Sequence, residues 1–254
     1  MENVIEVRNL TKKYGNTKVV DNVSLDIEKG KMISLIGPNG AGKSTVLSMI
    51  TRLMDMDEGQ VIIDGTELSK WDSKELSKRI SILKQANDVN LRLTIRELVE
   101  FGRFPHSQGN ITAVDNEFID KAIKYMQLED IEHRYLDELS GGQKQRAYIA
   151  MVIAQDTEYI FLDEPLNNLD MKHCVQMMKV IRGLVDDLGK TVVTVLHDIN
   201  FASCYSDIIV ALKDGKMYKQ GETLSIINNE VLEDLYNTEF KIQDIEDKKI
   251  CIYF

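Results

Sequence analysis

One stretch of the sequence decides the fold: Ile33-Ser34-Leu35-Ile36-Gly37-Pro38-Asn39-Gly40-Ala41-Gly42-Lys43-Ser44-Thr45. Its first four residues have strand character, and apolar residues at helical spacing follow the glycine-rich turn. Residues 37–44, from Gly37 to Lys43-Ser44, match the phosphate-binding pattern G-x-x-x-x-G-K-[ST]. The match lies between a strand and a helix, which is the context that this pattern needs. An ordinary strand–turn–helix with a surface lysine is the alternative interpretation.

Each residue type in this loop has a reason to be there. Glycines let the backbone turn tightly and bring N–H groups to phosphate oxygens, and the following helix directs its positive end at the same anion. Lys43 would reach the β- and γ-phosphates, and the Ser44 hydroxyl would ligate Mg²⁺. The loop therefore predicts binding of a nucleoside triphosphate with magnesium, without distinguishing ATP from GTP.

Composition narrows the class of protein. The 254 residues are 43% hydrophobic, enough for one large α/β domain or two small ones. We find no apolar run of about 18 residues that would span a membrane, and the N-terminus lacks the features of a secretory signal. The net charge of −10 makes nucleic-acid binding less favourable. The sequence predicts a soluble cytoplasmic protein.

Neither the cysteines nor the histidines suggest a metal site. The three cysteines are odd in number and widely spaced, as expected for reduced thiols, and the four histidines form no ligand-spaced cluster.

The chain alternates between strand-rich and helix-rich regions. Short strands are predicted at 4–7, 19–20, 23–27, 31–36, 59–65 and 80–84, and Tyr14 reads as a loop residue before Gly15. From Thr94, which opens a capping box with Glu97, to about Gln155 the chain reads as helical, with a loop at 101–112. Strands return at 159–162 and 191–196 around a helix at 171–188. A hairpin at Asp214-Gly215, a helix near 230–236 and a weak final strand close the chain.

Two carboxylates follow the apolar strand at 159–162. P-loop NTPases hold Mg²⁺ with a carboxylate at the end of such a strand, a role that Asp163 would fill through water. Glu164 would act as the general base that polarises the attacking water. For Glu164, a solvated acid at a strand end is the alternative.

Two further polar residues end predicted strands. His197 would donate a hydrogen bond to the γ-phosphate, although a lone histidine at a strand end is usually ordinary loop chemistry. Gln85, after the strand at 80–84, is similarly weak by itself.

The segment Leu139-Ser140-Gly141-Gly142-Gln143 opens a helix and forms a second candidate anion site, from a serine hydroxyl and glycine N–H groups. No nucleotide site lies near it in the sequence. A head-to-tail pair of chains solves this, because each serine segment then completes the nucleotide site of the other chain.

These motifs in this order resemble the ATP-binding subunits of ABC transporters, over essentially the whole chain. The 94 residues from 46 to 139 separate the phosphate loop from Ser140. The resemblance implies an α/β fold of the P-loop NTPase type, with a mixed core sheet flanked by helices, an N-terminal antiparallel β subdomain and an inserted helical subdomain. It implies one ABC ATPase domain over 1–254: a nucleotide-binding core at 1–85 and 156–220, a helical signature subdomain at 86–155 and a C-terminal extension at 221–254.

The resemblance also assigns roles. ATP and Mg²⁺ are the implied cofactors. Tyr14 would stack on adenine, Gln85 would contact Mg²⁺ or water, His197 would sense the γ-phosphate, and Asp170 would couple the two sites of a homodimer. The ATP-binding set comprises Tyr14, Gly37, Pro38, Asn39, Gly40, Ala41, Gly42, Lys43, Ser44 and Thr45, with Ser140, Gly141, Gly142 and Gln143 acting in trans. The magnesium set is Ser44, Gln85 and Asp163.

Within that family, three segments resemble importers of ferric siderophores, catecholate types among them, and related cobalamin or haem systems. They are 101–106 (Phe-Gly-Arg-Phe-Pro-His), 162–170 and the C-terminal tail. Asn167-Asn168 departs from the commoner serine-alanine, which leaves the contacts of Asp170 open. The aromatic residues of 101–106 are equally compatible with simple packing.

An importer implies partners: two separate permease subunits, docked near Gln85 and 87–93, and an extracytoplasmic binding protein. The ATPase would then lie at the cytoplasmic face of the membrane and bind no nucleic acid. An exporter with separate subunits remains an alternative. Chromosome-associated ABC ATPases insert coiled coils for which 94 residues leave no room, and translation factors usually carry two ATPase heads.

Overall fold

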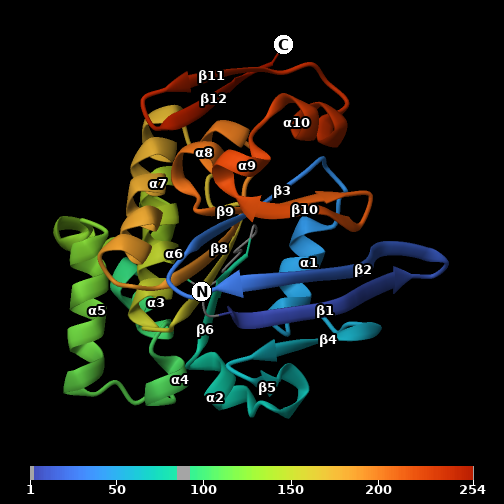
Figure 1. The fold of residues 1–254 in the computed structure, drawn as a ribbon. Helices are drawn as coiled ribbons and strands as arrows, with labels where there is room; N and C mark the ends of the chain where they lie inside the picture. The colour runs from blue at the N-terminus through green and yellow to red at the C-terminus, as the bar shows by residue number, and fades with distance from the viewer. Residues whose placement is uncertain (1–2, 85–91, 254) are drawn as a thin grey trace. The chain divides into compact units, whose positions relative to one another are not determined.

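The computed structural model describes residues 3–84 and 92–253 (Figure 1). They form two compact units: Met1–Trp71 with Arg182–Phe254, and Asp72–Ile181. No helix among the described residues has both the length and the apolar character needed to cross a membrane.

The first unit begins with an antiparallel sheet in the order β2-β1-β4-β5. Its strands are β1 (Asn3–Tyr14), β2 (Thr17–Glu28), β4 (Glu58–Ile63) and β5 (Thr66–Glu67). The prediction of two short strands at 19–27 was wrong, because β2 runs through the turn-like residues at its centre. Asn22 adopts a left-handed φ of 56°, and the β1–β2 register shifts there. The turn signal therefore marks a bulge within one strand.

A second, mixed sheet in this unit carries the phosphate loop. Its strands lie in the order β10-β9-β3-β8: β3 (Met32–Ile36), β8 (Thr191–Val195), β9 (Ile208–Lys213) and β10 (Lys216–Glu222). β3 is parallel to β8 and β9, whereas β10 returns antiparallel to β9. All residues of β3 and β8 are buried, as expected for parallel strands inside an α/β unit.

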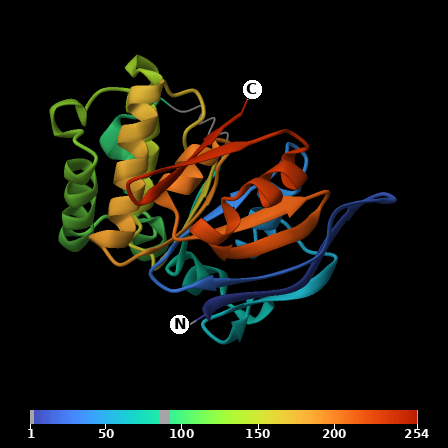
Figure 2. The same ribbon diagram turned by 45° about the horizontal axis from the view of Figure 1, so that its top comes forward.

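Helices and a terminal hairpin complete the first unit (Figure 2). They are α1 (Lys43–Ile50), the one-turn η1 (Leu68–Lys70), α8 (Ile199–Tyr205), α9 (Thr223–Ile226), α10 (Asn229–Tyr236), β11 (Lys241–Ile245) and β12 (Lys248–Ile252). Asn200 of α8 bonds both the N–H and the C=O of Cys251, at 2.7 and 3.1 Å, and so holds β12 against this helix. The weak final strand predicted from the sequence is thus the second strand of a hairpin.

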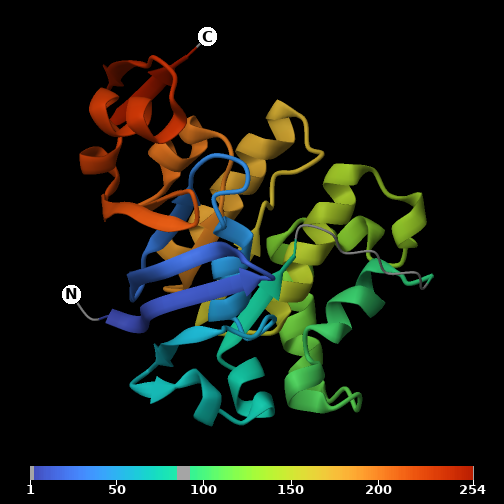
Figure 3. The same ribbon diagram turned by 90° about the vertical axis from the view of Figure 1, so that its right-hand side faces the viewer.

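The second unit combines two parallel strands with a group of helices. β6 (Ile80–Leu83) pairs with β7 (Tyr159–Asp163). Its helices are α2 (Ser73–Ser77), α3 (Ile95–Phe101), α4 (Phe104–Ser107), α5 (Ala113–Tyr125), η2 (Glu129–Ile131), η3 (Leu136–Glu138) and α6 (Gly141–Ala154), and α7 (Met171–Asp186) begins in it. The α6 helix packs against both α3 and α5, as the green to yellow helices of Figure 3 show.

The predicted start of α3 is confirmed in detail. The Thr94 hydroxyl accepts the Glu97 N–H at 3.2 Å, and the Glu97 carboxylate accepts the Thr94 N–H at 2.7 Å. The loop predicted at 101–112 was wrong in part, because α4 lies within it. Proline near the N-terminus of a helix is favourable, so Pro105 helps to start α4 rather than to end it. The predicted helical subdomain at 86–155 falls inside the second unit, which also holds β6 and β7.

A buried ion pair anchors the helices of the second unit. Arg103 donates to the Asp115 carboxylate at 2.9 Å and to the Ala154 carbonyl at 2.8 Å, and its guanidinium lies 4.3 Å from the centre of the Phe118 ring. The Arg103 and Asp115 side chains are only 5% and 6% exposed. The Thr112 hydroxyl and the Arg103 guanidinium lower the pKa of Asp115 to about 2. The Arg103 residue of the 101–106 segment is therefore structural.

We expect Arg103→Ala to destabilise the protein by about 3–5 kcal/mol, because it leaves the Asp115 carboxylate buried without its cation. Urea denaturation followed by circular dichroism measures this change. Arg134→Ala is the matched control, since Arg134 forms an exposed pair with Glu138 at 4.0 Å and should cost at most about 1 kcal/mol. Equal effects of the two substitutions would contradict the structural role of Arg103.

Candidate functional site

The phosphate loop lies between β3 and α1 in the first unit. Gly37, Gly40 and Gly42 have φ values of 144°, 80° and 92°, which favour glycine. Gly42 is the N-terminal cap of α1 and, having no side chain, makes no side-chain capping hydrogen bond. The loop thus has the backbone geometry that binds phosphate at a helix N-terminus.

Lys43 lies over this loop. Its side chain is buried, and its ammonium donates to the carbonyls of Gly37 at 2.7 Å and Pro38 at 3.0 Å. Gly37 itself is enclosed, since an added Cβ would come within 2.0 Å of the Leu212 carbonyl oxygen. Only glycine fits here, and the Lys43 ammonium lies against the carbonyls at the start of the loop.

His197 and the phosphate loop lie at the same edge of the mixed sheet. β3 and β8 are parallel neighbours with Leu35 opposite Val195, and the Leu196 N–H donates to the Leu35 carbonyl at 3.2 Å. Because Gly37 follows one strand and His197 closely follows the other, both leave the sheet at its carboxyl edge. His197 is exposed there.

Tyr14 ends β1 rather than lying in a loop. Its ring is 55% exposed, the Lys12 ammonium lies 6.0 Å from the ring centre, and its hydroxyl donates to the Met54 sulfur at 3.4 Å. An exposed ring with one edge held in place is suited to stacking on a planar ligand.

The two predicted acids, Asp163 and Glu164, lie in the second unit. Asp163 is the buried last residue of β7, and Glu164 follows with a left-handed φ of 53°. The Asn167 amide donates to the Glu164 carboxylate at 2.5 Å. The strained backbone and this short hydrogen bond fix where the Glu164 carboxylate points, so Asn167 is an orienting residue that the sequence pattern did not reveal.

The signature segment caps α6. The Ser140 hydroxyl accepts the Gln143 N–H at 3.3 Å, and the Gln143 side chain accepts the Ser140 N–H at 3.0 Å. A hydroxyl that accepts one hydrogen bond still carries a proton to donate. Ser140 and Gly141 are exposed, so this helix end is accessible to a ligand from outside the unit.

Asp170 is held next to the signature segment. The N–H of His173 donates to the Asp170 carboxylate at 2.9 Å, and the ring Nδ1 lies 2.7 Å from the same oxygen. These backbone and ring contacts hold the pKa of Asp170 below its usual range. The His173 ring lies over Gly142, where an added Cβ would approach it to 3.0 Å. His173 thus joins two predicted site segments.

Two other predictions fall wholly or partly outside the described residues: Gln85, and residues 87–91 of the predicted docking segment 87–93. Of the rest, Arg92 stacks 4.1 Å from the centre of the Tyr135 ring, and Leu93 accepts the Leu136 N–H at 2.9 Å.

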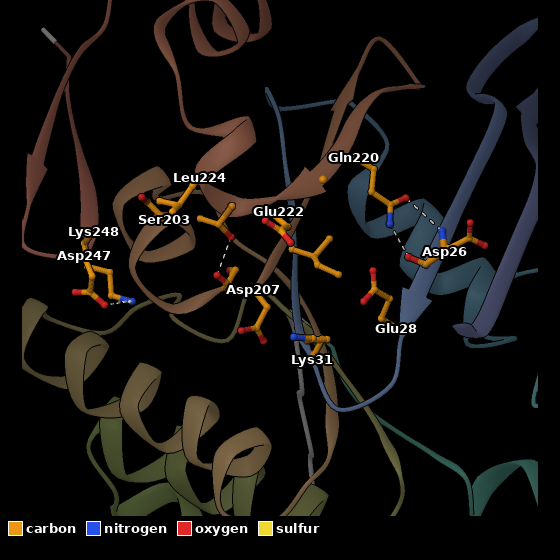
Figure 4. A pocket seen from close by; sticks show the side chains of 14 residues that line it. Asp26, Glu28, Lys31, Ser203, Asp207, Gln220, Glu222, Leu224, Asp247 and Lys248 are labelled. Carbon is orange, nitrogen blue, oxygen red and sulfur yellow. Dashed lines mark hydrogen bonds and ion pairs between the residues drawn. The ribbon is translucent and has the colours of Figure 1, made fainter. Parts of the chain in front are cut away.

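A separate hollow of about 600 Å³ in the first unit contains none of the predicted site residues (Figure 4). Its Asp207 carboxylate pairs with Arg182 at 2.8 Å, and Asp247 pairs with Lys248 at 3.7 Å. The Gln220 side chain bonds both backbone groups of Asp26, so this side chain ties β10 to β2. The Gln220 and Asp207 side chains of this hollow thus join separate elements of the unit.

Comparison with known proteins identifies the family. Residues 20–167 match the ABC transporter family. The chain belongs to the ABC transporter family. It is 59% identical over 99% of its length to the whole of a petrobactin import ATP-binding protein of Bacillus subtilis (strain 168). A second petrobactin import ATP-binding protein, from Bacillus anthracis, is 48% identical over 94% of this chain and 96% of its own.

A solved structure agrees with the sequence comparison. The dimeric structure of a bacterial ABC transporter cassette superposes with a TM-score of 0.77 at 34% identity, covering 86% of this chain and 98% of the other. The predicted fold class is confirmed, and the chain is an ATPase of the ABC family. In this ABC ATPase the phosphate loop, Tyr14 and His197 lie in the first unit, and the acids and the signature segment lie in the second.

Three contacts of this ABC ATPase are not evident from the sequence patterns. Asn167 orients Glu164, His173 links Asp170 to Gly142, and the Tyr236 hydroxyl accepts the Gly37 N–H. The departure at Asn167 was visible as an unusual residue near the acids. No local pattern connects Tyr236 with Gly37, because 199 residues separate them.

Proposed function

We propose that this chain is the ATPase subunit of an importer for ferric siderophores, with petrobactin as the cargo. The observation that carries the proposal is the 59% identity to a petrobactin import ATP-binding protein over that protein's full length. In such a system the ATPase contacts the permease rather than the cargo. Similarity along the whole chain therefore supports docking on a permease of the same type.

ATP would bind first to the loop of the first unit. The N–H groups of the loop and of the α1 N-terminus would surround the phosphates, with the Lys43 ammonium against the β- and γ-phosphates. The exposed Tyr14 ring would stack on the adenine. These contacts hold the nucleotide and leave its γ-phosphate toward His197, which shares the carboxyl edge of the sheet.

The oxygen donors fit a magnesium ion that arrives with the nucleotide. Mg²⁺ is usually held by one or two protein oxygens together with phosphates and waters, and the Ser44 hydroxyl and the Asp163 carboxylate are such donors. No group of three His, Cys, Asp or Glu side chains in the described part of the chain would bind a metal alone. When bound, the ion neutralises charge on the phosphates. Gln85 would contact the ion or the attacking water.

Hydrolysis would use the residues of the second unit. The Glu164 carboxylate, oriented by Asn167, would accept a proton from the attacking water, and His197 would donate a hydrogen bond to the γ-phosphate. Ser140, Gly141 and Gly142 of a second copy of the chain would complete the site at the α6 N-terminus. Asp170 would couple the two sites of this homodimer.

The energy of dimer closure would pass to two separate permease subunits. This arrangement places the protein at the cytoplasmic face of the membrane, held there by its partners. The segment 87–93 is our proposed docking region. We also propose that the chain has three parts: a nucleotide-binding core, a helical signature subdomain at 86–155 and a C-terminal extension at 221–254.

Uptake measurements test the cargo. We expect a strain lacking the gene to lose most uptake of radiolabelled iron supplied as ferric petrobactin and to keep uptake of a ferric hydroxamate. A plasmid copy of the wild-type gene should restore uptake, whereas a copy with Glu164→Gln should not. Normal petrobactin uptake in the deletion strain would reject this cargo, and a loss limited to the hydroxamate would reassign it.

A further inference from the structure

A tyrosine from the C-terminal part of the chain contacts the phosphate loop directly. Tyr236 is the last residue of α10, and its hydroxyl accepts the N–H of Gly37 at 3.1 Å. Gly37 is the first residue of the loop after β3. Both residues belong to the first unit, so the contact is internal to one compact body.

The contact holds a residue that also binds the phosphate-binding cation. The N–H of Gly37 is bound by Tyr236, and its carbonyl accepts the Lys43 ammonium at 2.7 Å. The backbone of Leu212 encloses Gly37 on another side. The two peptide groups that flank the Gly37 Cα are therefore both held, one by Tyr236 and the other by Lys43, and the position of Gly37 determines where Lys43 finds an acceptor in the loop.

Aromatic neighbours hold Tyr236 in this position. Its ring centre lies 6.0 Å from that of Phe240, which lies 5.4 Å from that of Tyr253 beyond β12. Phe240 is buried, and its carbonyl accepts the Asn229 amide at 2.9 Å. Burial raises the pKa of Tyr236 well above its usual value. The hydroxyl is thus neutral and its ring is packed, as expected for a fixed acceptor.

We propose that Tyr236 is a positioning residue of the nucleotide site, holding Gly37 through its N–H so that Lys43 and the loop N–H groups are arranged for a triphosphate before ATP arrives. The C-terminal segment 229–253 is then a working part of the ATPase site rather than an appendage. The inference rests on the proposed function, since it needs the loop to bind nucleotide. Preorganisation of this kind strengthens binding by removing the cost of ordering the loop.

Tyr236→Phe tests the inference, because it removes only the hydroxyl and keeps the packed ring. Loss of one hydrogen-bond acceptor from a buried N–H should raise the KM for ATP, and the Kd for a fluorescent ATP analogue, by about five- to tenfold. The kcat should stay within about twofold, as expected when binding common to the ground state and the transition state is lost. The KM, kcat and Kd are all measured on the full-length protein with magnesium.

Tyr218→Phe is the matched control. The Tyr218 hydroxyl bonds to Asp234 of the same helix, α10, and not to the loop, so its removal should leave KM and Kd at wild-type values. The melting temperature of each variant is recorded alongside. A lower melting temperature with unchanged KM and Kd for Tyr236→Phe would overturn the inference, as would equal effects in both variants. A wild-type protein that failed to bind ATP would instead reject the proposed function.

Discussion

Glu164→Gln should bind ATP as the wild type does and lose about a hundred- to ten-thousand-fold in turnover, the range typical of a lost general base. Glutamine keeps the length of the side chain and an oxygen that accepts the Asn167 amide, now 2.5 Å from the carboxylate. The loop after β7 should therefore keep its shape. The substitution removes the carboxylate that would take a proton from water, and glutamine has no group that can replace it in this role.

The measurement is steady-state phosphate release with saturating ATP and Mg²⁺, together with the Kd for a fluorescent ATP analogue. Glu158→Gln is a matched control, because Glu158 precedes the same strand and pairs with Arg79 at 3.3 Å. It should hydrolyse ATP at nearly the wild-type rate. Phosphate release by Glu164→Gln close to that of Glu158→Gln would remove Glu164 from the role of base.

The same variant should convert from a monomer to a dimer when ATP and Mg²⁺ are added. The reason lies in the α6 N-terminus, where the Ser140 hydroxyl keeps a proton to donate and the exposed Gly141 leaves the helix end accessible. The γ-phosphate of an ATP molecule bound to a second chain would bind at this helix end. Because the variant does not hydrolyse ATP, the γ-phosphate would stay there and keep the two chains together. Light scattering after size exclusion should show the mass double.

A nucleotide-binding variant supplies the control for dimerisation. Lys43→Ala in the Glu164→Gln background removes the ammonium group of the phosphate loop. Its hydrogen bonds to the ATP phosphates would be charge-assisted and therefore strong, so their loss should weaken ATP binding. This double variant should stay monomeric at the same ATP concentration. A Glu164→Gln protein that remains monomeric with saturating ATP and Mg²⁺ would show that the shared-site arrangement is wrong, and dimerisation of the double variant would show that ATP does not drive it.

Local patterns predicted the elements whose residues act on near neighbours. The phosphate loop, the Thr94–Glu97 capping box and the strands at Tyr159 and Thr191 lie where the sequence places them. Errors arose where a local signal had two meanings. Asn22 reads as a turn but forms a bulge inside β2, and Pro105 reads as a helix breaker but lies in the first turn of α4. At Asn22, pairing with the neighbouring strand β1 keeps the chain within β2. At Pro105, α4 directly follows Arg103, which is held by the buried Asp115.

The sequence by itself determined the family, the phosphate loop with Lys43 and the acids at 163–164, because each depends on residue types at fixed short spacings. Only the tertiary structure decided that Asn167 orients Glu164, that His173 bridges Asp170 and Gly142, and that Tyr236 holds Gly37. Such contacts depend on side-chain direction and on packing between distant segments. A hydrogen bond across 199 residues leaves no periodicity in the chain, so it becomes visible only once α10 is folded next to the phosphate loop.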